Sequence, residues 1–439
     1  MKQSEFKKRR KALMQQIGKG NIALIASASN LTRNRDVEFP FRQDSDFYYL
    51  TGFNEADSLA VFIPGREQGE YILFCREFDE KKALWEGAHA GLEGATAHYD
   101  ADDSFPIDDM DEILPGMLEN KSKVFYPMGR DSELDHQILE WITHIKKQSR
   151  SGVNAPGELV SLEHFLHEMR LFKSAEELKL MRRAAEVSCN AHKRVMQKCQ
   201  AGMYEYQVEA ELVHAFMQEG LRYVAYPSIV AGGKNACVLH YVENKDKLKK
   251  GDLLLIDAGV ECNHYAADIT RTFPVSGKFS LAQKQLYQLV LDAQYAAIEQ
   301  IQPGVPWNHA HDISVKVLTQ GLVELGLLKG RVSKLIKDET YKQFYMHRIG
   351  HWLGMDVHDV GDYKLDNEWR LLEPGMVLTI EPGLYIPENC QTVDAKWRGI
   401  GIRIEDDVLV TKQGHEVLTQ AVPKEINEIE RLMQGTHAA

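Results

Sequence analysis

Cysteine is scarce in this sequence and follows no pattern. The 439 residues contain six cysteines, none in a Cys-x-x-Cys spacing. A chain of this size can bury enough apolar surface to fold without disulfides, so we interpret the cysteines as reduced, buried side chains. This excludes a disulfide scaffold and a structural zinc site built from cysteine pairs.

Long apolar runs and strongly basic segments are also missing. Apolar stretches such as 253–256 have the length of a strand, far short of the roughly 20 residues that cross a bilayer. The N-terminal region is basic but lacks the apolar core of a secretory signal. The 52 basic and 64 acidic residues give a net charge of −12, which disfavours nucleic-acid binding. We therefore expect a cytoplasmic protein that binds neither membranes nor nucleic acids.

What the sequence does contain is typical of a folded chain with more than one domain. Apolar residues make up 44% and charged residues 26%, which are ordinary values for globular proteins. In the first part of the chain, residues 22–26, 58–63 and 71–74 read as strands separated by turn residues, with space for helices between them. This pattern predicts an α/β domain.

A change of organisation follows near residue 172. An apolar stripe at helical spacing ends at Met169, and Ser174 to Glu177 then forms a capping box that predicts a helix through Met196. We place a domain boundary here, with one domain at residues 1–172 and a second at residues 173–439. In the second, helices come first and mostly antiparallel strands later, which favours an α+β fold.

Two aspartates mark neighbouring strands of the second domain. Asp257 ends an apolar strand, and Asp268 lies in the next one. A hairpin centred between Cys262 and Asn263 would set the two aspartates directly opposite each other, about 4.5–5.5 Å apart at Cβ. Two buried carboxylates at that distance repel unless a cation lies between them, and a pair of metal ions meets this need.

Two more acidic residues occur in similar apolar strands. The period of two places Glu381 on the same face as Val377 and Thr379, and places Arg403 on the same face as Glu405. Arg403 can either form an ion pair with Glu405 or balance the surplus negative charge of the whole group.

Histidines are concentrated between these acids. His347, His351 and His358 lie in a segment interrupted by Gly350 and Gly354, which predicts an irregular segment passing close to other backbone. The spacing of the first two matches the zincin motif His-Glu-x-x-His, but arginine at position 348 replaces the catalytic glutamate and excludes that family. One imidazole and four carboxylates suit hard or borderline divalent ions, Mn²⁺ most naturally, with Co²⁺ or Zn²⁺ as alternatives. The candidate metal ligands are Asp257, Asp268, His351, Glu381 and Glu405.

At these positions the sequence resembles the metallopeptidase family of creatinase, prolidase, methionine aminopeptidase and aminopeptidase P. The motifs that carry the resemblance are Asp257-Ala258-Gly259, Asp268-Ile269-Thr270-Arg271, the His351 segment, Glu381-Pro382-Gly383 and Glu405. Segments 42–53, 235–241 and 399–407 extend it over nearly the whole chain. The resemblance implies an α+β catalytic domain of the pita-bread fold, preceded by a smaller α/β domain.

The resemblance also implies roles for individual residues. Asp257 would hold one of two metal ions, Asp268 and Glu405 would bridge both, and His351 with Glu381 would complete the other site. Catalytic roles in proton movement, substrate contact and stabilisation of the tetrahedral intermediate would fall to Glu381, His240, His347 and His358. Further substrate-binding or supporting positions would be Asp36, Trp85, Tyr385 and Arg403. Arg348 stands where many relatives carry glycine.

The function implied is a metal-dependent exopeptidase that hydrolyses the N-terminal Xaa-Pro bond of peptides. A prolidase restricted to Xaa-Pro dipeptides is the alternative, and segment 42–53 favours the aminopeptidase P branch over it. A non-catalytic binding protein of the same fold is disfavoured because all five ligands are present. The expected partners are peptides with proline at the second position and other copies of the chain, in a homo-oligomeric dimer or tetramer.

Overall fold

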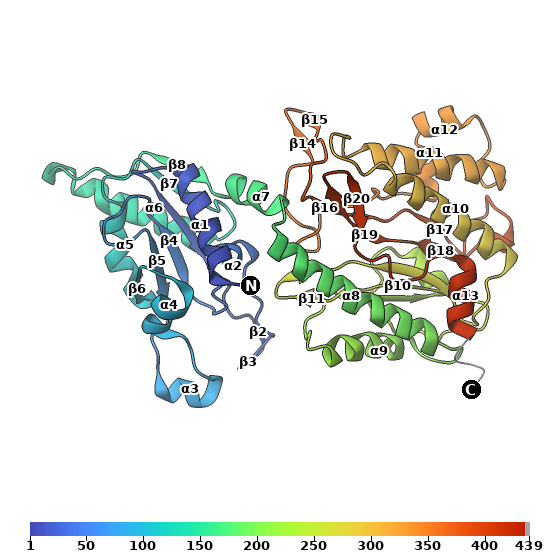
Figure 1. Ribbon diagram of the computed structural model, residues 1–439, viewed down its shortest axis with the longest axis horizontal. Coiled ribbons are helices and arrows are strands. Elements are labelled where there is room, and N and C mark those ends of the chain that lie inside the picture. Colours follow the sequence, from blue (N-terminus) through green and yellow to red (C-terminus); the bar gives the residue numbers. More distant parts are fainter. Residues whose placement is uncertain (435–439) are drawn as a thin grey trace. The chain divides into compact units, whose positions relative to one another are not determined.

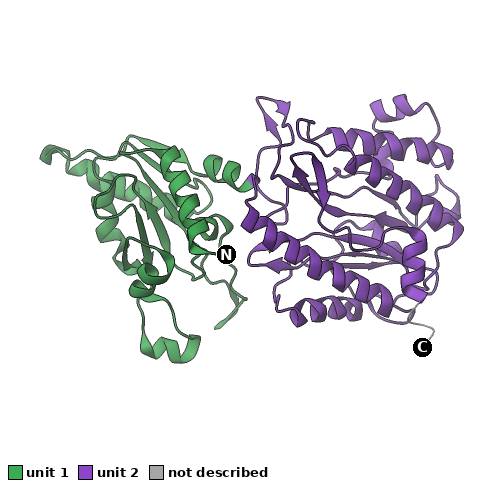
Figure 2. Cartoon of the chain, in the orientation of Figure 1, with its two compact units in different colours: residues 1–170 green, residues 171–439 purple. Residues whose placement is uncertain are grey.

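The computed structural model describes residues 1–434 and divides the chain into two compact units, Met1–Arg170 and the part from Leu171 onward (Figure 2). The boundary predicted from the sequence, after residue 172, differs by two residues from the observed one, which follows Arg170. Helix α7 (Glu163–Leu171) ends at this division, and α8 (Ala175–Lys198) opens the second unit.

Unit 1 is built on a six-stranded mixed sheet with the strand order β6-β5-β4-β1-β7-β8. Strand β4 pairs antiparallel with β1 and β5, and the outer pairs β5–β6 and β7–β8 are parallel. The predicted strands coincide with β1, β4 and β5, and the α/β expectation for this part is confirmed. The sheet strands are β1 (Ile22–Ala26), β4 (Leu59–Phe62), β5 (Tyr71–Cys75), β6 (Asp103–Pro106), β7 (Lys123–Tyr126) and β8 (Glu158–Ser161).

Helices cover this sheet, and two smaller elements extend from it (Figure 1). The small elements are the hairpin β2 (Thr32–Asn34) with β3 (Val37–Glu38) and the short helix α3 (Glu80–Glu86). No residue of α3 is buried. The remaining helices are α1 (Gln3–Ile17), α2 (Ser45–Thr51), α4 (Gly91–Tyr99), α5 (Met110–Leu118) and α6 (Ser132–Lys147).

Unit 2 begins with the predicted capping box. The Ser174 side chain accepts the Glu177 N–H, and the Glu177 carboxylate accepts the Ser174 N–H at 2.8 Å, which satisfies two otherwise free donors at the start of α8. In Figure 1, α8 with α9 and α10 with α11 lie on opposite sides of the strands. The other helices are α9 (Glu205–Gln218), α10 (Leu281–Ile298), α11 (His309–Glu324), α12 (Val332–Lys337) and α13 (Ile426–Gln434). None of the helices within residues 1–434 is both long and apolar enough to span a membrane.

The strands of unit 2 form several small antiparallel sheets. The order β13-β10-β9 makes one sheet, β16-β19-β20 a second, and β17-β18 a third. Short hairpins add β11 (Glu261–Cys262) with β12 (Tyr265–Ala266) and β14 (Lys364–Leu365) with β15 (Glu368–Trp369). The sheet strands are β9 (Ile229–Gly232), β10 (Leu253–Asp257), β13 (Thr270–Pro274), β16 (Val377–Ile380), β17 (Gly383–Ile386), β18 (Ile400–Arg403), β19 (Asp406–Thr411) and β20 (Gly414–Val417).

The register predicted between the first two acidic strands was wrong by two residues. Asp257 lies opposite Thr270 rather than Asp268, and Cys262 pairs with Tyr265. The cause is the turn, in which Asn263 and His264 both take positive φ angles of 47° and 69°, as a two-residue hairpin loop of type I′ requires. A shift of two residues keeps every side chain on its face, so both aspartates still point to the same side of the sheet.

Candidate metal centre and active site

Four acidic side chains from different strands converge on one cavity of about 670 Å³ in unit 2. Asp257 ends β10 and Asp268 lies in the link before β13, while Glu381 follows β16. Glu405 occupies the link between β18 and β19. Only Asp257 lies within a strand, and the other three acids lie in links directly beside strand ends. All four line the cavity, together with His351.

The tightest group within the cavity is Asp268, His351 and Glu405, which offer ligand atoms within 4.8 Å of one another. The ring Nδ1 of His351 donates to the Trp352 carbonyl oxygen at 2.9 Å. This contact leaves Nε2 facing the acids, at 3.4 Å from Asp268 and 3.6 Å from Glu381. A histidine held by a backbone carbonyl through one nitrogen, with the other directed at the carboxylates, is arranged as metal-ligating histidines are.

Backbone pairing explains why His351 lies beside Glu381. The Thr379 N–H donates to the His351 carbonyl at 2.9 Å, and the Glu381 N–H donates to the Ile349 carbonyl at 2.7 Å. A Cβ atom at position 350 would collide with the Thr379 carbonyl, so only glycine fits between the two segments. The irregular segment in close contact with other backbone is thus present as predicted.

Electrostatics in the cluster calls for added positive charge. Burial and the neighbouring acids raise the pKa of Glu405 well above its usual range, and burial raises that of Glu381 to about 7. Burial opposes protonation of His351. The hydrogen bond to Asp268 and the charge of Glu381 outweigh this effect of burial and raise the pKa of His351 to about 9. A cluster whose groups retain protons in this way is suited to exchange those protons for metal ions.

The formal charges give the same result. Six carboxylates gather in and directly behind the cavity, against three permanent cations. The excess of three negative charges falls to one negative charge with one divalent ion and becomes one positive charge with two, so the cluster accommodates one or two such ions. The carboxylates are those of Asp257, Asp268, Glu381, Glu405, Asp406 and Asp407, and the cations are Arg271, Arg403 and Lys424.

Two roles were predicted for Arg403, an ion pair with Glu405 or the balancing of the negative charge of the whole group. It pairs with Asp257 and not with Glu405, which favours the second role. Its Nη2 lies 2.5 Å from the Asp257 carboxylate, and its Nη1 donates to the Tyr385 hydroxyl at 3.0 Å. The Tyr385 hydroxyl is 2.9 Å from Nε2 of His347, whose Nδ1 lies 2.7 Å from the Arg348 carbonyl oxygen. A carbonyl only accepts, so Nδ1 carries the hydrogen and Nε2 accepts from Tyr385.

This chain of contacts keeps the His347 ring neutral. Burial and the charge of Arg403 lower the pKa of His347 to about 3. Arg348 itself is exposed, with its guanidinium 5.5 Å from the centre of the Trp369 ring. The arginine at this position has an exposed side chain that is among the residues lining the cavity, while its carbonyl orients His347.

Two further predicted residues, His240 and His358, also line the cavity. The His358 ring lies 4.3 Å from that of His351 and at 68° to it. Burial and the neighbouring His351 lower the pKa of His358. Both His240 and His358 are solvent-exposed, as residues that meet a substrate must be before it binds.

Asp36 and Trp85 are not among the residues of this cavity, which is lined by unit 2 alone. Asp36 lies in the turn between β2 and β3, and Trp85 lies in α3. Both are exposed, and Trp85 retains 89% of its accessible surface.

Three residues that contact the predicted metal ligands were not predicted from the sequence. The Tyr226 hydroxyl lies 2.7 Å from Asp257 and 2.5 Å from Asp268. The Thr270 hydroxyl donates to Glu405 at 2.6 Å, and the Asp407 carboxylate accepts the Asp268 N–H at 3.2 Å. Thr270 and Asp407 lie within two residues of ligands, and this adjacency was a usable signal. Tyr226 lies in an irregular loop far from them in sequence, where no local pattern marks it.

Comparison with known proteins identifies the class to which this fold and site belong. Residues 179–412 match metallopeptidase family M24, and residues 6–126 match the N-terminal domain of aminopeptidase P. The chain therefore belongs to metallopeptidase family M24. The predicted pita-bread α+β domain, preceded by a smaller α/β domain, is confirmed.

Individual relatives match along the entire chain. The Xaa-Pro aminopeptidase of Escherichia coli is 43% identical over 430 residues, covering 98% of this chain and 97% of the relative. The structure of Pseudomonas aeruginosa aminopeptidase PepP has a TM-score of 0.99 at 54% identity and covers 100% of this chain and 99% of that one. The structure of E. coli aminopeptidase P with the inhibitor Pro-Leu has a TM-score of 0.97 at 42% identity, with full coverage of both chains.

Proposed function

We infer that this protein is a metal-dependent exopeptidase that hydrolyses the bond between the first residue of a peptide and a proline at the second position. The observation that carries this inference is the convergence of four carboxylates and His351 on one cavity. The full-length likeness to the E. coli Xaa-Pro aminopeptidase supports the choice of substrate. Because that likeness includes the aminopeptidase P N-terminal domain, a prolidase restricted to dipeptides is not favoured.

We propose that the centre holds two divalent ions, most naturally Mn²⁺, with Co²⁺ or Zn²⁺ also compatible with the donors. Such ions, when bound, lower the pKa of a shared water and polarise the scissile carbonyl. Asp257 would hold one ion, Asp268 and Glu405 would bridge both, and His351 with Glu381 would complete the other site. Asp268 and Glu405 offer carboxylate oxygens within 4.8 Å of each other, and this closeness supports their bridging role.

Proton transfer is assigned to residues around this centre. Glu381 lines the cavity beside His351, so we assign it to accept the proton of the attacking water. His358 and His240 are exposed and face the cavity, so we assign them to donate hydrogen bonds to the developing oxyanion. Both ring nitrogens of His347 are engaged, with the Arg348 carbonyl and the Tyr385 hydroxyl, so we assign this histidine to contact with the substrate.

The cavity also offers a suitable surface for proline. Apolar side chains line part of the cavity, and a pyrrolidine ring can bury its methylene groups against them. An Xaa-Pro bond is a tertiary amide without an N–H, and nothing in this centre depends on gripping that hydrogen. The apolar lining consists of Pro227, Ile229, Leu239, Val242, Val357 and Tyr363.

Four supporting residues complete the proposal. Arg403 and Tyr385 would fix Asp257 and His347 through the contacts described above. For Asp36 and Trp85 we propose a role in substrate binding that rests on the family resemblance.

We also propose a cytoplasmic homo-oligomer, a dimer or tetramer. Exposed apolar side chains on unit 1, among them Leu31, Phe39, Leu84 and Trp85, support an interface between copies. All six cysteines are free, which suits a reducing compartment.

The test is an assay of metal-loaded protein on two peptides with proline second, a tripeptide and a dipeptide. Release of the first amino acid from the tripeptide is the expected result. Cleavage of the dipeptide alone would instead support the prolidase, and failure to cleave either peptide would contradict the proposed chemistry.

A further inference from the structure

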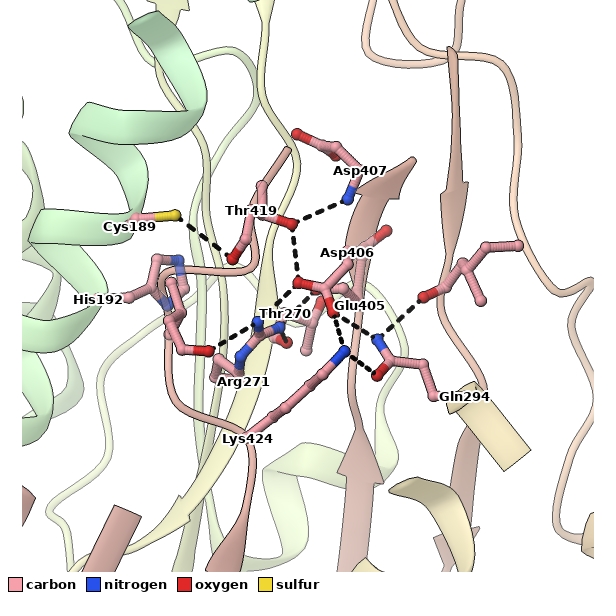
Figure 3. A network of polar contacts seen from close by, with 12 residues as sticks. Cys189, His192, Thr270, Arg271, Gln294, Glu405, Asp406, Asp407, Thr419 and Lys424 are labelled. Atoms are coloured by element: carbon pink, nitrogen blue, oxygen red, sulfur yellow. Dashed lines mark hydrogen bonds and ion pairs between the residues drawn. The ribbon is translucent and has the colours of Figure 1, made fainter. Parts of the chain in front are cut away.

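Behind the metal-binding cluster lies a second polar network, which we call the Asp406 network (Figure 3). Its members are Arg271, Gln294, Asp406, Thr419 and Lys424. The Asp406 carboxylate is fully buried and accepts four hydrogen bonds. Arg271 and Thr419 donate to Oδ1, each at 2.7 Å, while Lys424 at 2.7 Å and Gln294 at 3.0 Å donate to Oδ2.

The network holds the backbone of Glu405. Nη1 of Arg271 donates to the carbonyl oxygens of Glu405 at 2.5 Å and Thr270 at 3.0 Å. The Thr270 carbonyl also accepts the Glu405 N–H at 3.0 Å. With the Thr270 hydroxyl on its carboxylate, Glu405 is therefore held at its N–H, its carbonyl and its side chain.

A second connection leads from the network to Asp268. The Thr419 hydroxyl that donates to Asp406 also accepts the Asp407 N–H at 3.0 Å. The Asp407 carboxylate in turn accepts the Asp268 N–H at 3.2 Å. Thr419 follows β20, so a segment distant in sequence fixes the backbone of this ligand.

A third connection reaches the residue before Glu381. Nε2 of Gln294, on helix α10, donates to the Ile380 carbonyl at 3.4 Å as well as to Asp406. Three ligand-bearing segments, those of Asp268, Glu381 and Glu405, are thus anchored to one buried carboxylate. Arg271 and Lys424 bring two cations to that carboxylate, so the network also adds one net positive charge behind the acidic cluster.

We propose that the Asp406 network is a positioning device that holds Asp268, Glu381 and Glu405 at the separation two divalent ions require, and that it thereby sets the affinity of this protein for metal. The inference rests on the metal site of the proposed function. Asp406 and Lys424 act through the ligands and touch neither substrate nor metal.

Lys424 gives the sharpest test, because its side chain is 13% exposed and lies at the edge of the network. Lys424→Met removes the ammonium and keeps most of the apolar stem. Lys424→Arg keeps the charge. The matched control is Lys284→Met, because Lys284 also joins α10 to the C-terminal region, through Glu430 at 2.9 Å, but lies outside the network.

The measurement is titration of the metal-free full-length protein with Mn²⁺ by calorimetry and with Co²⁺ by absorption spectroscopy. Loss of a residue that orients metal ligands lowers metal affinity about 10- to 100-fold in known sites. We expect a loss of that size and an altered Co²⁺ spectrum for Lys424→Met and for Asp406→Asn. Affinity and spectrum should be preserved in Lys424→Arg and in the control.

A merely structural network would lower the melting temperature and leave Mn²⁺ affinity and the Co²⁺ spectrum unchanged, and that result would overturn the proposal. An equal loss of affinity in Lys284→Met would also overturn it. If Asp406→Asn fails to fold, Lys424→Met decides alone. Wild-type protein that binds both ions but leaves Xaa-Pro peptides intact would contradict the proposed function, whereas the positioning role is judged from metal affinity only.

Discussion

His351 and His358 lie in edge-to-face contact, yet we assign them different tasks, and their substitution provides a sharp test. His351 is fixed by the Trp352 carbonyl so that Nε2 faces the acids. His358 makes no hydrogen bond within the described part of the chain. Its neighbour Asp359, which could have held it in a structural role, pairs instead with Lys173 at 2.8 Å.

Replacing each histidine by alanine should therefore have different effects. His358→Ala removes one donor to the oxyanion, which costs on the order of 10²–10³ in kcat, or about 3–4 kcal/mol, while KM changes little. Both metal ions should remain. His351→Ala removes a ligand and should lower metal occupancy together with the rate.

Metal content per chain, melting temperature and kcat, measured on both variants, distinguish these outcomes. The exposed His214 on α9, outside the cavity, provides the control, and His214→Ala should leave all three quantities unchanged. Our assignment of His358 is wrong if His358→Ala loses an ion or retains a nearly normal kcat.

Three other predictions follow from the same contacts. Asp268→Ala should lower metal occupancy further than Asp257→Ala, measured by elemental analysis, because a bridging carboxylate serves both ions; equal losses would contradict the bridging role. Chelation should lower the melting temperature, since the acids then repel one another and the stabilisation by bound metal is lost; an unchanged melting temperature would argue against a metal bound by the folded state. Burial lowers the pKa of His192 from 6.5 to about 4, so its unfolded form binds more protons, and stability is complete above pH 6.5 and falls as the pH drops toward 4. Relative to His192→Gln, wild type should lose about 2 kcal/mol of unfolding free energy between pH 7.5 and 5 in urea titrations, and parallel pH profiles would refute this.

Much of the fold could be predicted because its signals are local. The capping box at Ser174 and Glu177 and the strands β1, β4 and β5 follow from neighbouring residues alone. The inward direction of Glu381 and Glu405 was predicted from the period of two along a strand, and both line the cavity although they lie just beyond the strand ends. The predicted hairpin register was wrong because it depends on where two consecutive residues, Asn263 and His264, take positive φ angles, which residues other than glycine do uncommonly.

The rest of the site depends on contacts between distant segments. Tyr226 reaches two aspartates, and Arg271 reaches Asp406, with no spacing in the sequence that indicates either pair. The partner of Arg403 could not be chosen beforehand, because an arginine beside Glu405 on one strand can reach across to Asp257. Tertiary packing decides such pairings, whereas the residue types and their faces are set locally.

The most direct test of the central claim is a titration of the metal-free protein with Mn²⁺, with release of the first amino acid followed on two peptides, Xaa-Pro-Yaa and Xaa-Ala-Yaa. We predict that hydrolysis of the proline peptide rises with metal and reaches its maximum near two ions per chain, with little hydrolysis of the alanine peptide at any point. Full activity in the absence of metal, or equal rates on the two peptides, would contradict the proposed function.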